Sequence, residues 1–423
     1  MTTTCEILGA HDDVAERLLH GRDRFTALAA MGPGQPDALI RSVIRAAREK
    51  GIMLTLMFAD LTGRAPFLGE DDKDAVERGA LRLIPLAGSV AKGWDAHCTE
   101  LPNALWDVDR LVLSGQLPVD GVLLRLYVDP KSDRLSYGDM VGYSHSALQT
   151  GAVVCADIVT DRAAALPGSS VAVDTDRISF AVRVRDEPAR TEPKTLTPST
   201  FGQNIVDLIP DGATLQLGIG SLAETVLAHL DQRRNLTVRS GIISPLFGRL
   251  HDGDTLCRTG GHAIETTGLV GDGAYDNDAL DSLLLRPVSE THNPRRLGAL
   301  SSFWAVNSAL EVDLFGHVNA EFIKGRRIAL AGGQSDFVRA AHVSKGGASV
   351  IALPSRTPKG QSRIVARLDP ARMPTTQTQD IDFVVSEQGV ACLRGLTLEA
   401  RRRAILHIAH PEVRDDLIRE AGL

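Results

Sequence analysis

Two glycines separated by one residue stand where the chain could do chemistry on a bound ligand. Gly218 and Gly220 follow residues 214–217, in which polar and apolar side chains alternate as in a half-buried strand. Ser221 is the expected N-cap of a helix whose apolar face is formed by Leu222, Val226 and Leu230. Such a junction brings backbone N–H groups to a phosphate or to the oxygen of a polarised carbonyl. A tight turn without a ligand gives the same pattern, so the spacing alone leaves both interpretations open.

A second glycine turn lies further along the chain. Gly332 and Gly333 follow residues 328–331, which are predicted to form a strand, and Lys345 precedes the next predicted strand. Two glycine turns and a lysine together predict a long ligand that carries phosphates. The alternative is that the glycines after Lys345 form only a turn between two elements, and their spacing does not decide between the two.

Composition excludes several classes of function. The chain has 423 residues, 43% of them hydrophobic, and a net charge of −7 with a pI near 6.0. A nucleic-acid-binding protein would usually show a basic face, so this acidic chain is not expected to bind nucleic acid. The five cysteines are scattered without a Cys-x-x-Cys pair, which predicts neither a metal site nor a disulfide framework. No secretory signal or membrane-spanning run is visible, so we expect a cytoplasmic protein that does not bind membranes.

Apolar strands alternate with helices along the whole sequence. A helical stripe over 38–47 and the near-continuous apolar runs that follow it predict mostly parallel sheets covered by helices; these runs are 52–58, 81–86, 122–128, 152–156, 349–353 and 383–385. A charged, proline-bearing stretch over about 183–198 interrupts the pattern and predicts a linker. The chain is therefore predicted to be α/β, with two related open domains over 1–190 and 198–423.

The second half of the sequence resembles one family closely. The matching stretches start with Gly-Ile-Gly-Ser-Leu-Ala-Glu-Thr-Val-Leu and continue in the family's order, over 218–227, 307–321, 332–337, 385–390, 393–395 and 404–411. They resemble the acetyl-CoA hydrolase/transferase family of class I CoA-transferases. Residues up to about 190 match more loosely, mainly through their α/β rhythm.

The resemblance implies an enzyme that moves CoA between an acyl-CoA and a small carboxylate, without a metal. It implies two related α/β domains with the acyl-CoA between them, and assembly into a homodimer or a larger homo-oligomer. By the same resemblance the thioester region would contact the first glycine turn, formed by Leu217, Gly218, Ile219, Gly220 and Ser221. Gly332 and Gly333 would line the path of coenzyme A, and Lys345 would meet its phosphates.

The sequence departs from the family at the position of the nucleophile. Family transferases use a glutamate, whose carboxylate attacks the acyl-CoA and gives a glutamyl-CoA thioester. That glutamate belongs to the strand after the helix that the first glycine turn opens. Counted from Gly218 without a gap, its position falls on Gly241, which has no side chain. No Asp or Glu occurs from 235 to 251, so a small shift of the alignment does not supply one.

Other side chains could take over part of this chemistry. Glu387, within Ser-Glu-Gln-Gly, is the first candidate for a replacement carboxylate or for a structural one that caps backbone N–H groups; the others are Glu265, Glu290 and Glu321. His262 and His292 could activate water, and Ser240 lies beside the vacant position. Three functions follow: a CoA-transferase, an acyl-CoA hydrolase or C–C bond-cleaving enzyme without a glutamyl-CoA intermediate, and a CoA-binding protein without catalysis.

Overall fold

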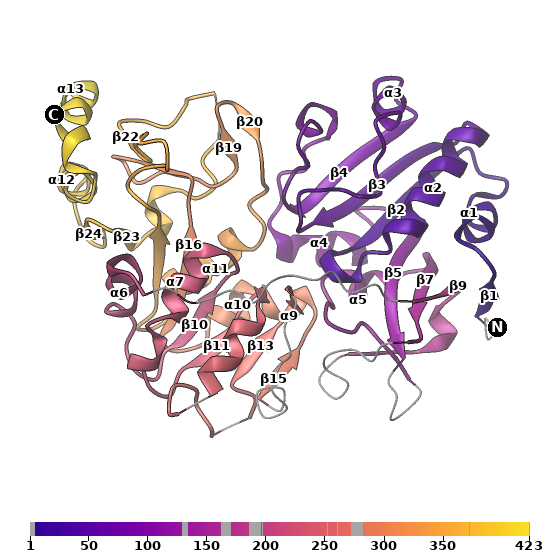
Figure 1. Cartoon of the computed structure of the whole chain (residues 1–423), viewed down its shortest axis with the longest axis horizontal. Helices are drawn as coiled ribbons and strands as arrows, with labels where there is room; N and C mark the ends of the chain where they lie inside the picture. The colour runs from indigo at the N-terminus through magenta and orange to yellow at the C-terminus, as the bar shows by residue number, and fades with distance from the viewer. Residues whose placement is uncertain are drawn as a thin grey trace.

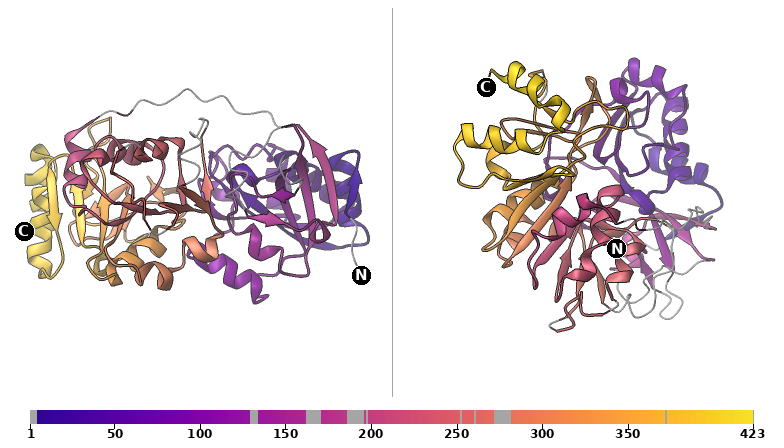
Figure 2. Two further views of the ribbon diagram at one scale, coloured as in Figure 1. Left: turned by 90° about the horizontal axis from the view of Figure 1, so that it is seen from below. Right: turned by 60° about the vertical axis from the view of Figure 1, so that its left-hand side comes forward.

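The chain folds around two large sheets that lie side by side (Figure 1). The computed structural model describes residues 5–128, 134–161, 171–185, 196, 198–251, 253–259, 261–271, 282–371 and 373–422. Viewed from below, the molecule is elongated, with one sheet and its helices at each end (Figure 2). No helix within these ranges is long and apolar enough to cross a membrane.

The first sheet is built from the N-terminal half. Its main strands pair in parallel in the order β1 (Glu6–Leu8), β9 (Phe180–Val184), β7 (Val153–Val159), β5 (Gly121–Val128), β2 (Arg24–Met31), β3 (Met53–Asp60) and β4 (Leu81–Gly88). Two short strands lie off this path: β6 (Leu135–Ser136) pairs antiparallel with the end of β5, and β8 (Ala172–Val173) pairs antiparallel with β6. The helices of this half are α1 (His11–Leu19), α2 (Asp37–Lys50), α3 (Asp72–Glu77), α4 (Leu105–Leu113) and α5 (Ser144–Ala147).

The second sheet is built from the C-terminal half. Its order is β15 (Leu283–Leu285), β13 (Ile264–Thr266), β11 (Thr237–Arg239), β10 (Thr214–Leu217), β16 (Phe303–Ser308), β21 (Ala348–Ala352), β23 (Phe383–Ser386) and β24 (Gly389–Cys392). Only the last pair, β23 with β24, is antiparallel. The helices of this half are α6 (Thr200–Val206), α7 (Ser221–Leu227), α9 (Val288–Thr291), α10 (Pro294–Gly298), α11 (Gln334–Val343), α12 (Leu398–His407) and α13 (Arg414–Ala421).

Shorter strands complete the C-terminal half beside its main sheet. They are β12 (Ile242–Ile243) with β14 (Gly268–Leu269), then β17 (Glu311–Asp313) with β18 (Val318–Asn319) and β22 (Ile364–Val365), and the hairpin of β19 (Phe322–Ile323) and β20 (Arg326–Arg327).

The central strands are parallel and apolar because helices cover both faces of each sheet. In β5, Val122, Leu123 and Leu124 are completely buried although they alternate between the two faces. Gly51 ends α2 in the left-handed conformation, with φ of 68°, so that the chain enters β3 at once. The predicted α/β class with mostly parallel sheets is confirmed.

One predicted strand is wrong. Residues 328–331 do not join a sheet; they form an isolated bridge between the two halves, in which Ala329 pairs with Ser89. Val90 N donates to Ile328 O at 3.0 Å, and Leu330 N donates to Gly88 O at 2.9 Å. These hydrogen bonds join residues 328–331 to the end of β4 and the residues after it. The apolar run therefore connects the C-terminal half to the N-terminal half. Of the predicted linker, residues 186–195 and 197 lie outside the described residues.

Further contacts fix the two halves against each other. Val141 N donates to Thr267 O at 2.9 Å, and Trp106 N in the first turn of α4 donates to Oδ2 of Asp336 at 3.1 Å. The N-cap of α4, Ala104, has no capping side chain of its own. Asp336 of α11 therefore accepts the hydrogen bond of a backbone N–H in the first turn of α4, which has no partner within that helix.

A buried carboxyl on α4 makes the stability of the fold depend on pH. Asp109 is 2% exposed, and neither of its oxygens has a well-directed hydrogen bond among the described residues, although Ser146 and Ser289 lie beside it. Burial raises the pKa of Asp109 to about 7. The folded state thus holds a proton that the unfolded chain, with a carboxyl pKa of about 3.9, releases.

We therefore expect stability to be lost as pH rises from about 4 to 7, and Asp109→Asn to remove that loss. The variant should raise the free energy of unfolding at pH 8 by about 2–4 kcal/mol and change it much less at pH 4.5. Urea denaturation of the wild type and the variant at both pH values measures this difference. The contributions of other titrating groups are the same in both proteins and cancel in the comparison. An equal effect at the two pH values would show that Asp109 does not titrate with folding.

Candidate active site

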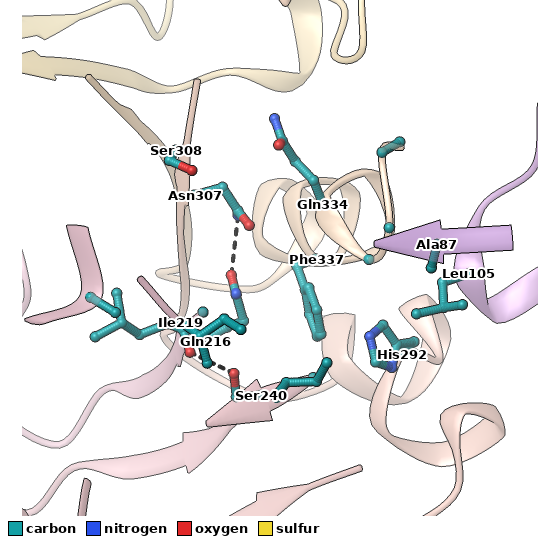
Figure 3. Close-up of a pocket in the computed structure, with 18 of the residues that line it drawn as sticks. Ala87, Leu105, Gln216, Ile219, Ser240, His292, Asn307, Ser308, Gln334 and Phe337 are labelled. Carbon is teal, nitrogen blue, oxygen red and sulfur yellow. Dashed lines mark hydrogen bonds between the residues drawn. The ribbon is translucent and has the colours of Figure 1, made fainter. Parts of the chain in front are cut away.

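The carboxyl ends of strands from both sheets meet around one cavity of about 220 Å³. It is lined by residues at the carboxyl ends of β2, β3 and β4 of the first sheet and of β10 and β16 of the second sheet. In parallel α/β sheets the crevice beyond the carboxyl ends of the strands is the usual place for a ligand. The lining residues are Met31, Leu61, Ala87, Gly88, Leu105, Gln216, Leu217, Gly218, Ile219, Leu222, Ala223, Ser240, Gly241, Ile242, His292, Val306, Asn307, Ser308, Ala331, Gly332, Gly333, Gln334 and Phe337 (Figure 3).

The first glycine turn forms one wall of this cavity. Leu217, Gly218 and Ile219 line it, and a Cβ added to Gly218 would meet open space. Gly220 and Ser221 do not line the cavity. Gly220 has φ of 97°, a conformation that glycine adopts without strain, and it is the N-cap of α7. The prediction that Ser221 is the N-cap is wrong, because Ser221 is already the first residue of the helix.

The second glycine turn reaches the same cavity, but the predicted lysine does not. Gly332 and Gly333 line the wall opposite the first turn, immediately before α11. Lys345 lies between α11 and the beginning of β21, and its carbonyl accepts a hydrogen bond from Ser302 N, just before β16. This is the amino edge of the parallel sheet, whereas the cavity is at the carboxyl edge. The structure therefore does not bring Lys345 to the glycine turns.

Uncharged polar groups fix the floor of the cavity. Asn307 Nδ2 donates to Gln216 Oε1 at 3.1 Å, which joins the ends of β16 and β10 (Figure 3). Ser240 Oγ donates to Leu217 O at 2.7 Å. The hydroxyl proton of Ser240 is therefore committed to the backbone, and no base among the described residues accepts a hydrogen bond from this hydroxyl.

His292 occupies the space beside Gly241, the position predicted from the sequence for the family nucleophile. A Cβ added to Gly241 would lie 2.8 Å from Nε2 and 3.0 Å from Cε1 of His292. A Cβ added to Gly333 would lie 2.4 Å from Cδ2 and 2.6 Å from Nε2 of the same ring. Phe337 packs against the imidazole with ring centroids 4.7 Å apart. The ring thus fits in a slot that exists because both flanking residues are glycines. Figure 3 shows His292 beside Phe337.

Burial determines the charge of His292. The residue is 2% exposed, and desolvation lowers its pKa to about 3. Its imidazole is therefore neutral at physiological pH, and Nδ1 lies 2.9 Å from Oγ1 of the buried Thr291. No Asp, Glu, Lys or Arg occurs among the lining residues that the structure describes.

The replacement carboxylates considered from the sequence all lie outside the cavity lining. Glu387 follows β23, where Oε2 accepts from Ser355 N at 2.8 Å and Oε1 from the Ser355 hydroxyl. Burial acts to raise the pKa of Glu387, but the Ser355 hydrogen bonds outweigh it and hold the pKa below its usual value. This geometry favours the structural interpretation, a carboxylate that caps backbone N–H groups. Each of the remaining three carboxylates is paired with an arginine: Glu265 with Arg296, Glu290 with Arg286 and Glu321 with Arg327.

The other sequence candidates separate in the same way. His262 is exposed on the surface and does not line the cavity. The sequence offered His262 and His292 as equal candidates for activating water. His292 is the one titratable side chain in the described cavity lining. Within the described ranges, no three His, Cys, Asp or Glu side chains gather closely enough to hold a metal ion.

The fold places the chain in one structural class. The solved structure of 4-hydroxybutyrate CoA-transferase from Porphyromonas gingivalis superposes with a TM-score of 0.76 at 25% identity, over 99% of this chain and 97% of that one. The structure of RipA from Yersinia pestis gives 0.77 at 23% identity with the same coverage. This is the CoA-transferase fold, with two α/β halves and mostly parallel sheets.

Sequence comparison defines the family. Residues 274–421 match the model of the acetyl-CoA hydrolase/transferase C-terminal domain. The chain is 30% identical over 409 residues to 4-hydroxybutyrate coenzyme A transferase of Clostridium kluyveri, covering 92% of this chain and 91% of that protein. The chain belongs to the acetyl-CoA hydrolase/transferase family and is an enzyme of that family.

Proposed function

We propose that this enzyme moves CoA from an acyl-CoA to a small carboxylate that attacks the thioester directly, without a glutamyl-CoA intermediate. One observation carries the proposal. The described lining of the cavity between the two glycine turns contains no Asp or Glu, and His292 lies against Gly241, the residue that the sequence comparison predicts at the family nucleophile position. A covalent thioester on the protein needs a carboxylate there, so the attacking oxygen has to come from a substrate.

The proposed steps balance without a protein nucleophile. The acceptor carboxylate adds to the thioester carbonyl, the C–S bond breaks, and CoA thiolate leaves a mixed anhydride of the two acids. The thiolate then attacks the acceptor's carbonyl carbon, the anhydride C–O bond breaks, and the donor acid leaves as its carboxylate. No proton has to be transferred in either step. The protein would supply orientation by its two glycine turns and backbone donors near the carbonyl oxygen at Gly218 and Ile219.

Hydrolysis of the acyl-CoA is a second candidate. The absence of Lys and Arg from the described cavity lining favours it, because no cation is present there to attract an acceptor carboxylate. The acetyl-CoA hydrolase of Kluyveromyces lactis is 32% identical over 266 residues, which is 57% of this chain and 49% of that protein. In this case water, rather than a carboxylate, would attack between the glycine turns.

Coenzyme A as the thioester substrate, a homodimer or larger homo-oligomer, and a cytoplasmic location belong to the same proposal. The activities of the related CoA-transferases and acetyl-CoA hydrolases support the first.

Initial-rate kinetics test the proposed function. Rates measured against acyl-CoA at several fixed carboxylate concentrations should give intersecting double-reciprocal lines, because both substrates must be bound before any product leaves. Release of free CoA without a carboxylate would instead identify the hydrolase. Parallel lines would contradict the proposal, since they indicate a covalent enzyme intermediate that forms before the acceptor binds.

A further inference from the structure

We infer that the enzyme takes an acyl-CoA whose acyl group is an uncharged alkyl chain, and that four apolar side chains of the N-terminal half select it. This inference rests on the proposed function and names the class of its thioester substrate. The four side chains, here called the acyl wall, are Met31, Leu61, Ala87 and Leu105. They lie at the carboxyl ends of β2, β3 and β4 and at the start of α4.

The cavity lining divides by polarity between the two halves of the chain. The N-terminal half contributes the acyl wall and Gly88, so none of its described lining side chains is polar. Every polar side chain of the described lining comes from the C-terminal half; these are Gln216, Ser240, His292, Asn307, Ser308 and Gln334. The two glycine turns also belong to the C-terminal half. A thioester held by these turns therefore has polar groups on its own side and faces an apolar surface on the other.

Solvent exposure distinguishes the mouth of the cavity from its inner end. Ile219 is 40% exposed, and Ser308 is also exposed. Met31, Ala87 and Leu105 are 1%, 2% and 3% exposed. Figure 3 shows Ala87 and Leu105 across the cavity from the two exposed residues. Because coenzyme A is much larger than a cavity of about 220 Å³, it must extend through the exposed side, which leaves the acyl chain against the acyl wall.

Two glycines fix the position of Leu61 at this wall. A Cβ added to Gly32 would lie 2.5 Å from Cδ1 of Leu61, and one added to Gly88 would lie 3.4 Å from Cδ2. The branched end of Leu61 therefore fills space that is open because residue 32 is glycine. Since this side chain has a defined place and lines the cavity, its volume limits the length of the acyl chain.

The acyl wall favours methylene groups and disfavours charge. Each methylene group that leaves water for an apolar surface strengthens binding by a factor of about 4. A carboxylate at the end of the acyl chain would instead be buried without a cation, because the described lining contains no Lys or Arg. The wall thus selects for chain length and against a second acid group.

Three thioesters of matched structure test the inference, with propanoate as the common acceptor. Butyryl-CoA and succinyl-CoA differ only in a terminal methyl group against a carboxylate, and acetyl-CoA lacks two methylene groups of butyryl-CoA. We expect kcat/KM of butyryl-CoA to exceed that of acetyl-CoA about 15-fold and that of succinyl-CoA about 100-fold or more. Equal values for butyryl-CoA and succinyl-CoA would overturn the inference.

Leu61→Lys should admit succinyl-CoA, because it places an ammonium group at the acyl wall. The ratio of kcat/KM for succinyl-CoA to that for butyryl-CoA should rise by a factor of about 10 or more. Ile219→Ala, at the mouth of the cavity, is the matched control and should leave this ratio within about twofold. Should Leu61→Lys fail to fold, Leu61→Ala takes its place, and its ratio for hexanoyl-CoA to butyryl-CoA should rise about tenfold. An unchanged ratio in the folded Leu61 variant would contradict the inference.

Binding measurements separate this inference from the proposed function. Isothermal titration calorimetry without an acceptor should give a lower Kd for butyryl-CoA than for succinyl-CoA. If this order holds but propanoate yields no propanoyl-CoA, the proposed transfer is wrong and the acyl preference is supported. If propanoyl-CoA forms from succinyl-CoA as fast as from butyryl-CoA, the transfer is supported and the inference is wrong.

Discussion

Gly241→Glu alone is expected to damage the enzyme, whereas the same change combined with His292→Gly should create a covalent glutamyl-CoA intermediate. In the single variant the new Cβ would lie 2.8 Å from Nε2 of His292, closer than real contacts allow. Gly241 is buried and His292 is packed against Phe337, so a displaced imidazole would enter the cavity that it lines. We expect a loss of about 1–3 kcal/mol of stability from overpacking, and loss of most activity.

In the double variant, His292→Gly removes the imidazole that a side chain at residue 241 would meet. The backbone of Gly241 does not adopt a positive φ, so a glutamate fits the chain conformation once the imidazole is gone. Incubation with acyl-CoA should then add the mass of CoA to the protein, and borohydride should reduce the modified side chain of the introduced glutamate to an alcohol. His292→Gly alone is the matched control and should give no adduct. A folded double variant without an adduct would show that residue 241 does not face the thioester.

Gly333→Ala is expected to abolish most activity while leaving the backbone of its turn unstrained. Gly333 has φ of −87°, which alanine adopts readily, so its only difficulty is the added Cβ. That atom would lie 2.4 Å from Cδ2 of His292 and 2.8 Å from Cε2 of Phe337. Both rings line the cavity and must move, and a displacement of about 1 Å within an active site can cost a factor of about 100 in rate.

Gly151→Ala is the matched control for this prediction. A Cβ at Gly151 meets nothing within 4 Å, and the residue lies in a bend away from the cavity. Steady-state rates and melting temperatures of both variants should be measured together. We expect kcat of Gly333→Ala to fall about 100-fold and that of Gly151→Ala to stay unchanged. Equal activity in the two variants would mean that the His292 slot has no part in turnover.

Long apolar runs were sufficient to predict most central strands. The strands over Val122–Leu124 and Ala348–Ala352 are buried on both faces, so their composition alone marks them. Strand β2 was not predicted, because alanine favours helices over strands and half of this strand's buried segment is alanine. Residues 328–331 have a strand-like composition, but they pair across the two halves, and such a contact between distant segments leaves no local pattern.

The first glycine turn follows the carboxyl end of a parallel strand, where a ligand site is expected, whereas the second follows a segment that pairs with the first sheet and reaches the same cavity. The same reasoning excludes Lys345, which precedes a parallel strand and so lies at the opposite edge. His292 had no comparable signal. Its slot is formed by Gly241 and Gly333, which are distant from it in sequence, and its role follows only from their convergence in the fold.

The most direct test of direct transfer is chemical trapping of the wild-type enzyme during turnover. The protein is mixed with acyl-CoA, treated with borohydride, and analysed by peptide mass for CoA adducts and reduced glutamates. We predict that no glutamate is modified and that carboxylate-dependent transfer continues after the treatment, because no carboxylate belongs to the described cavity lining. A reduced glutamate, at Glu387 or elsewhere, together with loss of activity would contradict the proposed mechanism.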